Sequence, residues 1–162
     1  MSHPQHPPRS AAEQALVDAT IVEIFQELVS FNRVLGLQIL SVKPGDVRAQ
    51  FAMRPDLVGH YAYGRLHGGV ISAVLDSMAG LALLVAIAER HPQDGPPQLA
   101  QRFTRMGTID LRVDFLRQGV GPCFTATAEV TRLGGRIGST QMRLQDNAGT
   151  LVATAAASFV VA

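Results

Sequence analysis

The chain has 162 residues, of which 47% are hydrophobic and 17% charged, with a formal net charge of +1. This length and composition fit one globular domain with a substantial core and exclude a disordered chain. The near-neutral charge also argues against a nucleic-acid partner, which would need a basic stripe on the surface.

The chain begins with a polar, proline-rich stretch, MSHPQHPPR. It lacks the apolar region of a secretory signal, so we expect a disordered tail over residues 1–9 and a single domain over residues 10–162. His3 and His6 are metal-ligating residue types, but two histidines in a loose tail make a weak site, and we predict no metal. The one cysteine, Cys123, cannot form an internal disulfide, which suits the cytoplasm, and we interpret it as a small residue at a strand start.

The first half of the domain predicts a helix followed by two strands. An S-x-x-E capping box begins at Ser10, and apolar residues recur behind it at helical spacing, which predicts an amphipathic helix over residues 11–31. Residues 34–53 resemble two strands joined by a Lys-Pro-Gly-Asp turn at residues 43–46. Residues 54–65, rich in Gly, Pro and Tyr, predict a loop.

A long apolar segment, GRLHGGVISAVLDSMAGLALLVA, covers residues 64–86 and predicts a helix that ends near Arg90. Apolar residues occur on all sides between residues 70 and 88, so the helix is expected to be buried on most sides. The run is nearly long enough to span a membrane. We reject a membrane span because the run contains an acid near its middle, and because soluble-type strands follow it.

The remaining sequence predicts strands. The stretch HPQDGPP at residues 91–97 ends the helix, and apolar and charged residues then alternate over residues 109–115. Further strands are expected over residues 124–131 and 136–144, joined by a Gly-Gly turn, and over residues 150–161. Because the connections are short, the sheet is antiparallel. The predicted fold class is α+β, with one sheet covering one central helix and an extra N-terminal helix.

One carboxylate, Asp76, lies inside the apolar helix. A buried carboxylate without partners is costly, so such a residue is usually paired or placed where a substrate binds. We favour a functional role and leave a capping or salt-bridge role open. Gly68 and Gly69 begin the same helix, where unpaired N–H groups and the helix dipole favour an oxyanion, and glycine lets a carbonyl approach.

Gly69 and Asp76 are two helical turns apart, about 10 Å along one helix. An acid at that distance cannot easily act on a carbonyl held at its own helix N-terminus. Two helices packed antiparallel across a two-fold axis would bring the glycines of one chain near the acid of the other. We therefore predict a homodimer with two composite sites.

Two blocks, LHGGVISAVLDSMAG and GTIDLRVDFLRQG, resemble the PaaI-like branch of the hotdog-fold acyl-CoA thioesterases. The second block and the stretch FNRVLG are especially similar to the bacterial YigI group within that branch. The resemblance covers most of the chain after the first helix. It implies a hotdog fold, in which an antiparallel sheet wraps around a long central helix, and a homodimer that in this family often assembles into a homotetramer.

The resemblance also implies catalytic roles. The backbone N–H of Gly68 would donate to the thioester carbonyl, and Asp76 of the other subunit would act as general base or as nucleophile. Thr108 would help to hold the attacking water. His67 would shape the loop and support the site, and a purely structural role for it is equally open.

The loop before the helix departs from the family pattern. Related enzymes carry an asparagine six or seven residues before the histidine, and this chain has Tyr61 and His60 there. Either residue could hydrogen-bond the acyl group or the histidine, or simply line the loop. We include both among the predicted substrate-binding residues, together with Gly69 and Ser77.

The implied reaction is hydrolysis of an acyl-CoA to the free acid and CoA, without cofactor or metal. The YigI-like blocks favour medium or long acyl chains, and an aromatic acyl group is an alternative. Val74, Met78 and Leu81 are candidates to contact the acyl chain, or plain core residues. Arginine, which suits phosphate, supplies nearly all basic residues, and the candidates to bind the CoA phosphates are Arg102, Arg105, Arg112, Arg117, Arg132 and Arg136.

Three other functions fit the fold. A hotdog dehydratase would need a proline-rich histidine motif that the sequence lacks. The second is a non-catalytic acyl-CoA-binding protein. The third is a purely structural dimer, which would not need Asp76.

Overall fold

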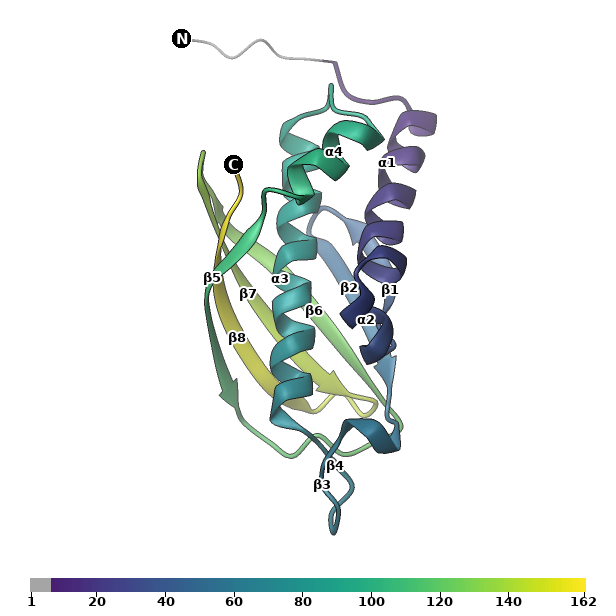
Figure 1. Ribbon diagram of the computed structural model, residues 1–162, viewed down its shortest axis with the longest axis vertical. Coiled ribbons are helices and arrows are strands. Elements are labelled where there is room, and N and C mark those ends of the chain that lie inside the picture. The colour runs from purple at the N-terminus through teal and green to yellow at the C-terminus, as the bar shows by residue number, and fades with distance from the viewer. Residues whose placement is uncertain (1–6) are drawn as a thin grey trace.

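A computed structural model describes residues 7–162, which form an antiparallel sheet with helices on one of its faces (Figure 1). Most of the predicted tail, with His3 and His6, lies outside the described residues. The six-stranded sheet has the order β1-β2-β6-β7-β8-β5. Its strands are β1 (Gln38–Lys43), β2 (Asp46–Ala52), β5 (Gly107–Phe115), β6 (Cys123–Leu133), β7 (Ile137–Asp146) and β8 (Leu151–Val160).

These strands confirm the six predicted from alternation, with ends that differ by a few residues. All pairings are antiparallel. Cys123 begins β6, is half-buried and forms no disulfide, as interpreted from the sequence. The mixed α+β fold with a long central helix is confirmed.

The central helix, α3 (Gly68–Arg90), lies against the inner face of the sheet, chiefly on β6 and β7 (Figure 1). Among the described residues it is the one helix whose length and apolar composition would allow a membrane span, but 67% of that apolar window is buried inside the domain. Val74, Met78 and Leu81 are fully buried. The apolar run is therefore the core helix of the domain.

The N-terminal helix is interrupted, unlike the continuous helix expected to residue 31. The capping box at Ser10 is present, but α1 (Ala11–Glu23) passes into a π-helical turn, η1 (Ile24–Leu28), and then into α2 (Ser30–Leu35). Val29 is extended at the break. The buried side-chain amide of Asn32 donates to the carbonyl oxygen of Phe25 at 2.8 Å, so a side chain just after the break satisfies a carbonyl just before it.

The prediction of strands alone after residue 91 was wrong in one place, because a short helix, α4 (Pro96–Phe103), follows α3. Its prolines occupy the first helical turn, where the absent N–H costs nothing, and the Gln98 side chain accepts from the Gly95 N–H at 3.2 Å. Leu99 is fully buried. The prolines therefore begin a helix as well as ending one.

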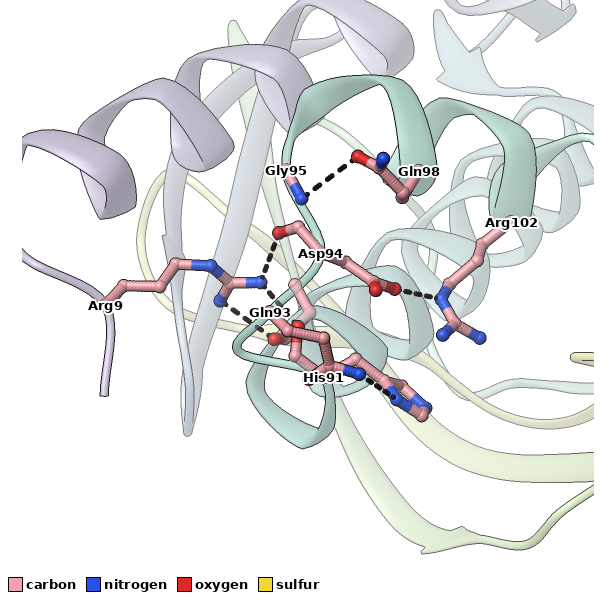
Figure 2. A network of polar contacts seen from close by, with 8 residues as sticks. Arg9, His91, Gln93, Asp94, Gly95, Gln98 and Arg102 are labelled. Atoms are coloured by element: carbon pink, nitrogen blue, oxygen red, sulfur yellow. Dashed lines mark hydrogen bonds and ion pairs between the residues drawn. The ribbon is translucent and has the colours of Figure 1, made fainter. Parts of the chain in front are cut away.

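Arg9 binds the end of α3, although the sequence analysis assigned it to the loose tail. Its guanidinium donates to the carbonyl oxygens of Ala88, His91 and Asp94, each at 2.8 Å (Figure 2). The Asp94 carboxylate pairs in turn with Arg102 at 2.5 Å. A cation at this position satisfies the carbonyl of Ala88 in the last turn of α3 and complements the helix dipole.

The predicted loop over residues 54–65 contains short ordered elements: η2 (Pro55–Leu57), β3 (Val58–His60) and β4 (Arg65–Leu66). The two strands pair as a small hairpin that projects beyond the N-terminal end of α3 (Figure 1). The hairpin ends at Leu66, two residues before α3 begins at Gly68.

Candidate active site

Asp76 faces the edge strand β5 from the middle of α3. It is half-buried, and one of its carboxylate oxygens accepts a hydrogen bond from the Thr108 hydroxyl at 2.9 Å. None of the ion pairs within residues 7–162 involves Asp76. A carboxylate with one oxygen held and the other free is suited to act as a base or a nucleophile.

The two glycines at the start of α3 differ in their N–H groups. His67 is the N-cap residue, and its Nδ1 accepts from the Gly69 N–H at 2.9 Å, so a neutral His67 carries its proton on Nε2. No acceptor for the Gly68 N–H lies in the described part of the chain. Of the two predicted glycines, Gly68 therefore offers its amide to a ligand, whereas the amide of Gly69 is occupied by the cap.

The start of α3 lies close to both β5 and β3. A Cβ atom on Gly68 would lie 3.4 Å from two ring carbons of Phe115 at the end of β5, an ordinary van der Waals contact. A Cβ on Gly59 would lie 2.6 Å from the His67 Cα, so the backbone of β3 presses against the cap residue. Phe115 was not predicted as a site residue. The one feature of the sequence that could have indicated it is its place in the GTIDLRVDFLRQG block.

Gly68 and Asp76 do not meet within one chain. Eight residues of α-helix separate them by about 12 Å along the axis. Thr108 and Asp76 form one half of the predicted site, whereas Gly68 and His67 form the other half at the helix N-terminus. A single thioester cannot contact both halves of the same chain.

The outer edge of β5 is unpaired in the described residues, and the two ends of its predicted apolar face are exposed. Ile109 is 53% exposed and Phe115 is 56% exposed. An exposed apolar edge strand is a ready surface for pairing with another chain. Leu111 and Val113, between these two residues, are half-buried against the core, so the described residues cover the apolar side of β5 only in part.

Ser77, predicted to bind substrate, contacts the N-terminal helix. Its hydroxyl donates at 2.6 Å to the side-chain oxygen of Asn32, which is 1% exposed. The sequence analysis did not identify Asn32 as a partner. Its position in the FNRVLG stretch was the available signal.

His60 and Tyr61, which were predicted to contact the substrate, lie in the hairpin before α3. His60 is half-buried, whereas Tyr61 is 95% exposed.

Three of the arginines considered for the CoA phosphates have partners within the chain. Arg102 and Arg112 form ion pairs with aspartates at 2.5 and 3.0 Å, and Arg117 donates to a backbone carbonyl at 3.2 Å. Within the described residues no group of three or more His, Cys, Asp or Glu side chains could hold a metal ion.

A family model described as the Thioesterase superfamily matches residues 63–153. The medium/long-chain acyl-CoA thioesterase YigI of Salmonella typhimurium is 39% identical over 150 residues, which cover 93% of this chain and 96% of that protein. The protein of the same name from Escherichia coli strain K12 is equally similar. The matched segments contain both halves of the candidate site.

Solved structures share the fold. A crystal structure from Shewanella oneidensis, described as related to the thioesterase superfamily, has a TM-score of 0.85 and 32% identity, covering 95% of this chain and 100% of that chain. A thioesterase family protein from Silicibacter pomeroyi has a TM-score of 0.67 and 23% identity, covering 88% and 96%. This second similarity shows the fold alone.

Proposed function

The chain belongs to the thioesterase superfamily, and we propose that it hydrolyses medium- and long-chain acyl-CoA thioesters to the free acid and CoA. The observation that carries this proposal is the Thr108–Asp76 hydrogen bond, which orients a carboxylate that has no ion-pair partner within residues 7–162. The chain-length preference rests on the 39% identity with the enzymes of that name. The superfamily assignment agrees with the family expected from the sequence blocks.

In the proposed mechanism, the Gly68 N–H donates to the thioester carbonyl oxygen and stabilises the negative charge that develops there. Asp76 takes a proton from water as the water oxygen attacks the carbonyl carbon. The carbon–sulfur bond then breaks, and the CoA thiolate leaves and takes up a proton. Thr108 holds the carboxylate in position, and His67 keeps the start of α3 formed by capping it.

We propose a homodimer in which Asp76 of one chain serves Gly68 of the other. The separation of about 12 Å within one helix supports this arrangement, since one thioester cannot reach both groups. The unpaired edge of β5, with exposed Ile109 and Phe115, supports it independently. A further association of dimers into a homotetramer is part of the same proposal.

The site as proposed needs neither cofactor nor metal, because the backbone amide and the carboxylate together supply the charge stabilisation and the proton transfer. We place the enzyme in the cytoplasm, with acyl-CoA as its partner and without nucleic acid or membrane. The free Cys123 is compatible with a reducing compartment.

The test is release of CoA thiol from acyl-CoAs of increasing chain length and from phenylacetyl-CoA, comparing wild type with Asp76→Asn. General-base contributions of about 10²- to 10⁴-fold set the expected loss in kcat. Asp46→Asn is the matched control, since Asp46 forms an exposed ion pair with Arg48 at 2.7 Å. An Asp76→Asn variant with full activity would contradict the mechanism. A wild type that binds acyl-CoA without releasing thiol would support the non-catalytic alternative.

A further inference from the structure

The tip of the β3–β4 hairpin exposes two aromatic side chains. Tyr61 is 95% exposed and Tyr63 is 64% exposed, although the hairpin itself contains only short strands. Aromatic rings that are largely exposed to water bury little apolar surface and contribute little to folding. Two of them on one projecting hairpin suggest a surface for a flat ligand.

The ring of His60 lies against both tyrosines. Its centroid is 5.5 Å from that of Tyr61, with the planes nearly parallel at 17°, and 4.7 Å from that of Tyr63. The Nδ1 atom of His60 is buried and has no hydrogen-bond partner among the described residues. Buried polar atoms are normally satisfied, so this nitrogen is a group that a ligand or bound water would complete.

A positive charge lies beside one of these rings. The guanidinium carbon of Arg65 lies 5.6 Å from the centroid of the Tyr63 ring, within the range of a cation–π contact. None of the ion pairs within residues 7–162 involves Arg65. The hairpin thus combines stacking surfaces with an arginine that has no acidic partner.

We propose that Tyr61, Tyr63 and Arg65 bind the nucleotide end of CoA, with the adenine stacked on the tyrosines and a phosphate held by the guanidinium. Aromatic rings stack nucleobases, and arginine matches phosphate geometry. This inference rests on the proposed function, since it places the thioester of the same ligand at the Gly68 amide. It assigns CoA recognition to the hairpin, in place of the sheet arginines considered from the sequence.

The spacing along the chain is compatible with one extended ligand. Tyr63 precedes Gly68 by five residues, so at most about 18 Å of backbone separates the stacking surface from the free amide. The pantetheine arm and pyrophosphate of CoA form a long flexible chain that can bridge such a span. The hairpin also leads directly into the helix N-terminus that would hold the thioester.

The test compares two thioesters with the same acyl group, decanoyl-CoA and decanoyl-pantetheine, which lacks the nucleotide. Base stacking contributes about 1–3 kcal/mol, so Tyr63→Ala is expected to raise KM for decanoyl-CoA about 5- to 150-fold. The kcat for decanoyl-CoA and the kinetics with decanoyl-pantetheine should stay unchanged. Tyr63→Phe, which keeps the stacking ring, should retain the wild-type KM, and Arg65→Gln should raise KM for decanoyl-CoA alone.

Arg48→Gln is the matched control for the charge change, because Arg48 is an exposed arginine of the sheet. The proposal is overturned if the hairpin variants raise KM equally for decanoyl-CoA and decanoyl-pantetheine, or raise it for neither. It is also overturned if they lower the mass of the protein in solution, which would show that a second chain covers the tyrosines. If wild type cleaves neither thioester, the proposed function fails, and calorimetric titration with CoA decides separately: CoA binding that weakens in Tyr63→Ala supports the hairpin site, and no CoA binding refutes it.

Discussion

The hydrogen bond between Thr108 and Asp76 makes a quantitative prediction for Thr108→Val. Valine keeps the shape of threonine and removes the hydroxyl that donates to the carboxylate at 2.9 Å. The carboxylate then loses the one side-chain donor that orients it among the described residues. The chemical step should slow, because a base held in several orientations spends less time in the reactive one.

A hydrogen bond to a charged group contributes about 1.5–3 kcal/mol when it is removed from water. The Thr108–Asp76 pair is exposed in one chain, so water can replace part of the lost interaction. We therefore expect the low end of that range, a loss of about 10-fold in kcat. The free energy of unfolding should change by less than about 0.5 kcal/mol, as for other exposed substitutions.

Steady-state thiol release with decanoyl-CoA measures kcat and KM for wild type, Thr108→Val and Thr108→Ser. The serine variant keeps the hydroxyl and should retain most of kcat, while KM should be similar in all three. A valine variant with wild-type kcat would refute the positioning role of Thr108. A serine variant as slow as valine would show that the methyl group matters, and the hydrogen bond does not.

Two further predictions concern the C-terminal end of α3. Arg9→Met removes three hydrogen bonds from the guanidinium and should lower the melting temperature by about 2–10 °C, whereas Arg33→Met, on an exposed arginine, should leave it nearly unchanged. Burial, and next the charge of Arg102, lower the pKa of His91 below its ordinary value of 6.5. As the pH falls, the unfolded chain therefore protonates His91 before the folded chain does, so the free energy of unfolding should decrease below about pH 6.5. In His91→Gln the decrease should be smaller. Chemical denaturation at several pH values measures the free energy of unfolding of both proteins.

Local sequence patterns predicted most of the elements because the periodicity of each segment matches its burial. The strand alternation and the all-round apolar run at residues 70–88 are properties of one segment and its nearest layer. The break at Val29 and the helix at Pro96 are different, since residues beside both contact other elements. Asn32 accepts a hydrogen bond from Ser77 on α3, and Leu99 fills a position in the core.

The site residues also differ in whether a local sequence pattern could identify them. Asp76 was found because an acid in an apolar helix conflicts with its surroundings, and such conflicts occur where function requires them. The contact of Ser77 with Asn32 spans 45 residues, and no local pattern marks it. Tyr61 was singled out because it stands near the position of the family asparagine, whereas the exposure of Tyr61 and Tyr63 on one hairpin was not predicted.

The choice between Gly68 and Gly69 shows where sequence reasoning reaches its limit. Both glycines begin the same helix, and both have an N–H that the helix leaves free. The conformation of the His67 side chain distinguishes them, because its ring nitrogen accepts from Gly69 and leaves Gly68 unpaired. The histidine thus acts on the proposed oxyanion site indirectly, by satisfying the neighbouring amide. The motif HGG supplies one cap and one open donor, and the second chain of the proposed dimer supplies the acid that the same helix holds too far away.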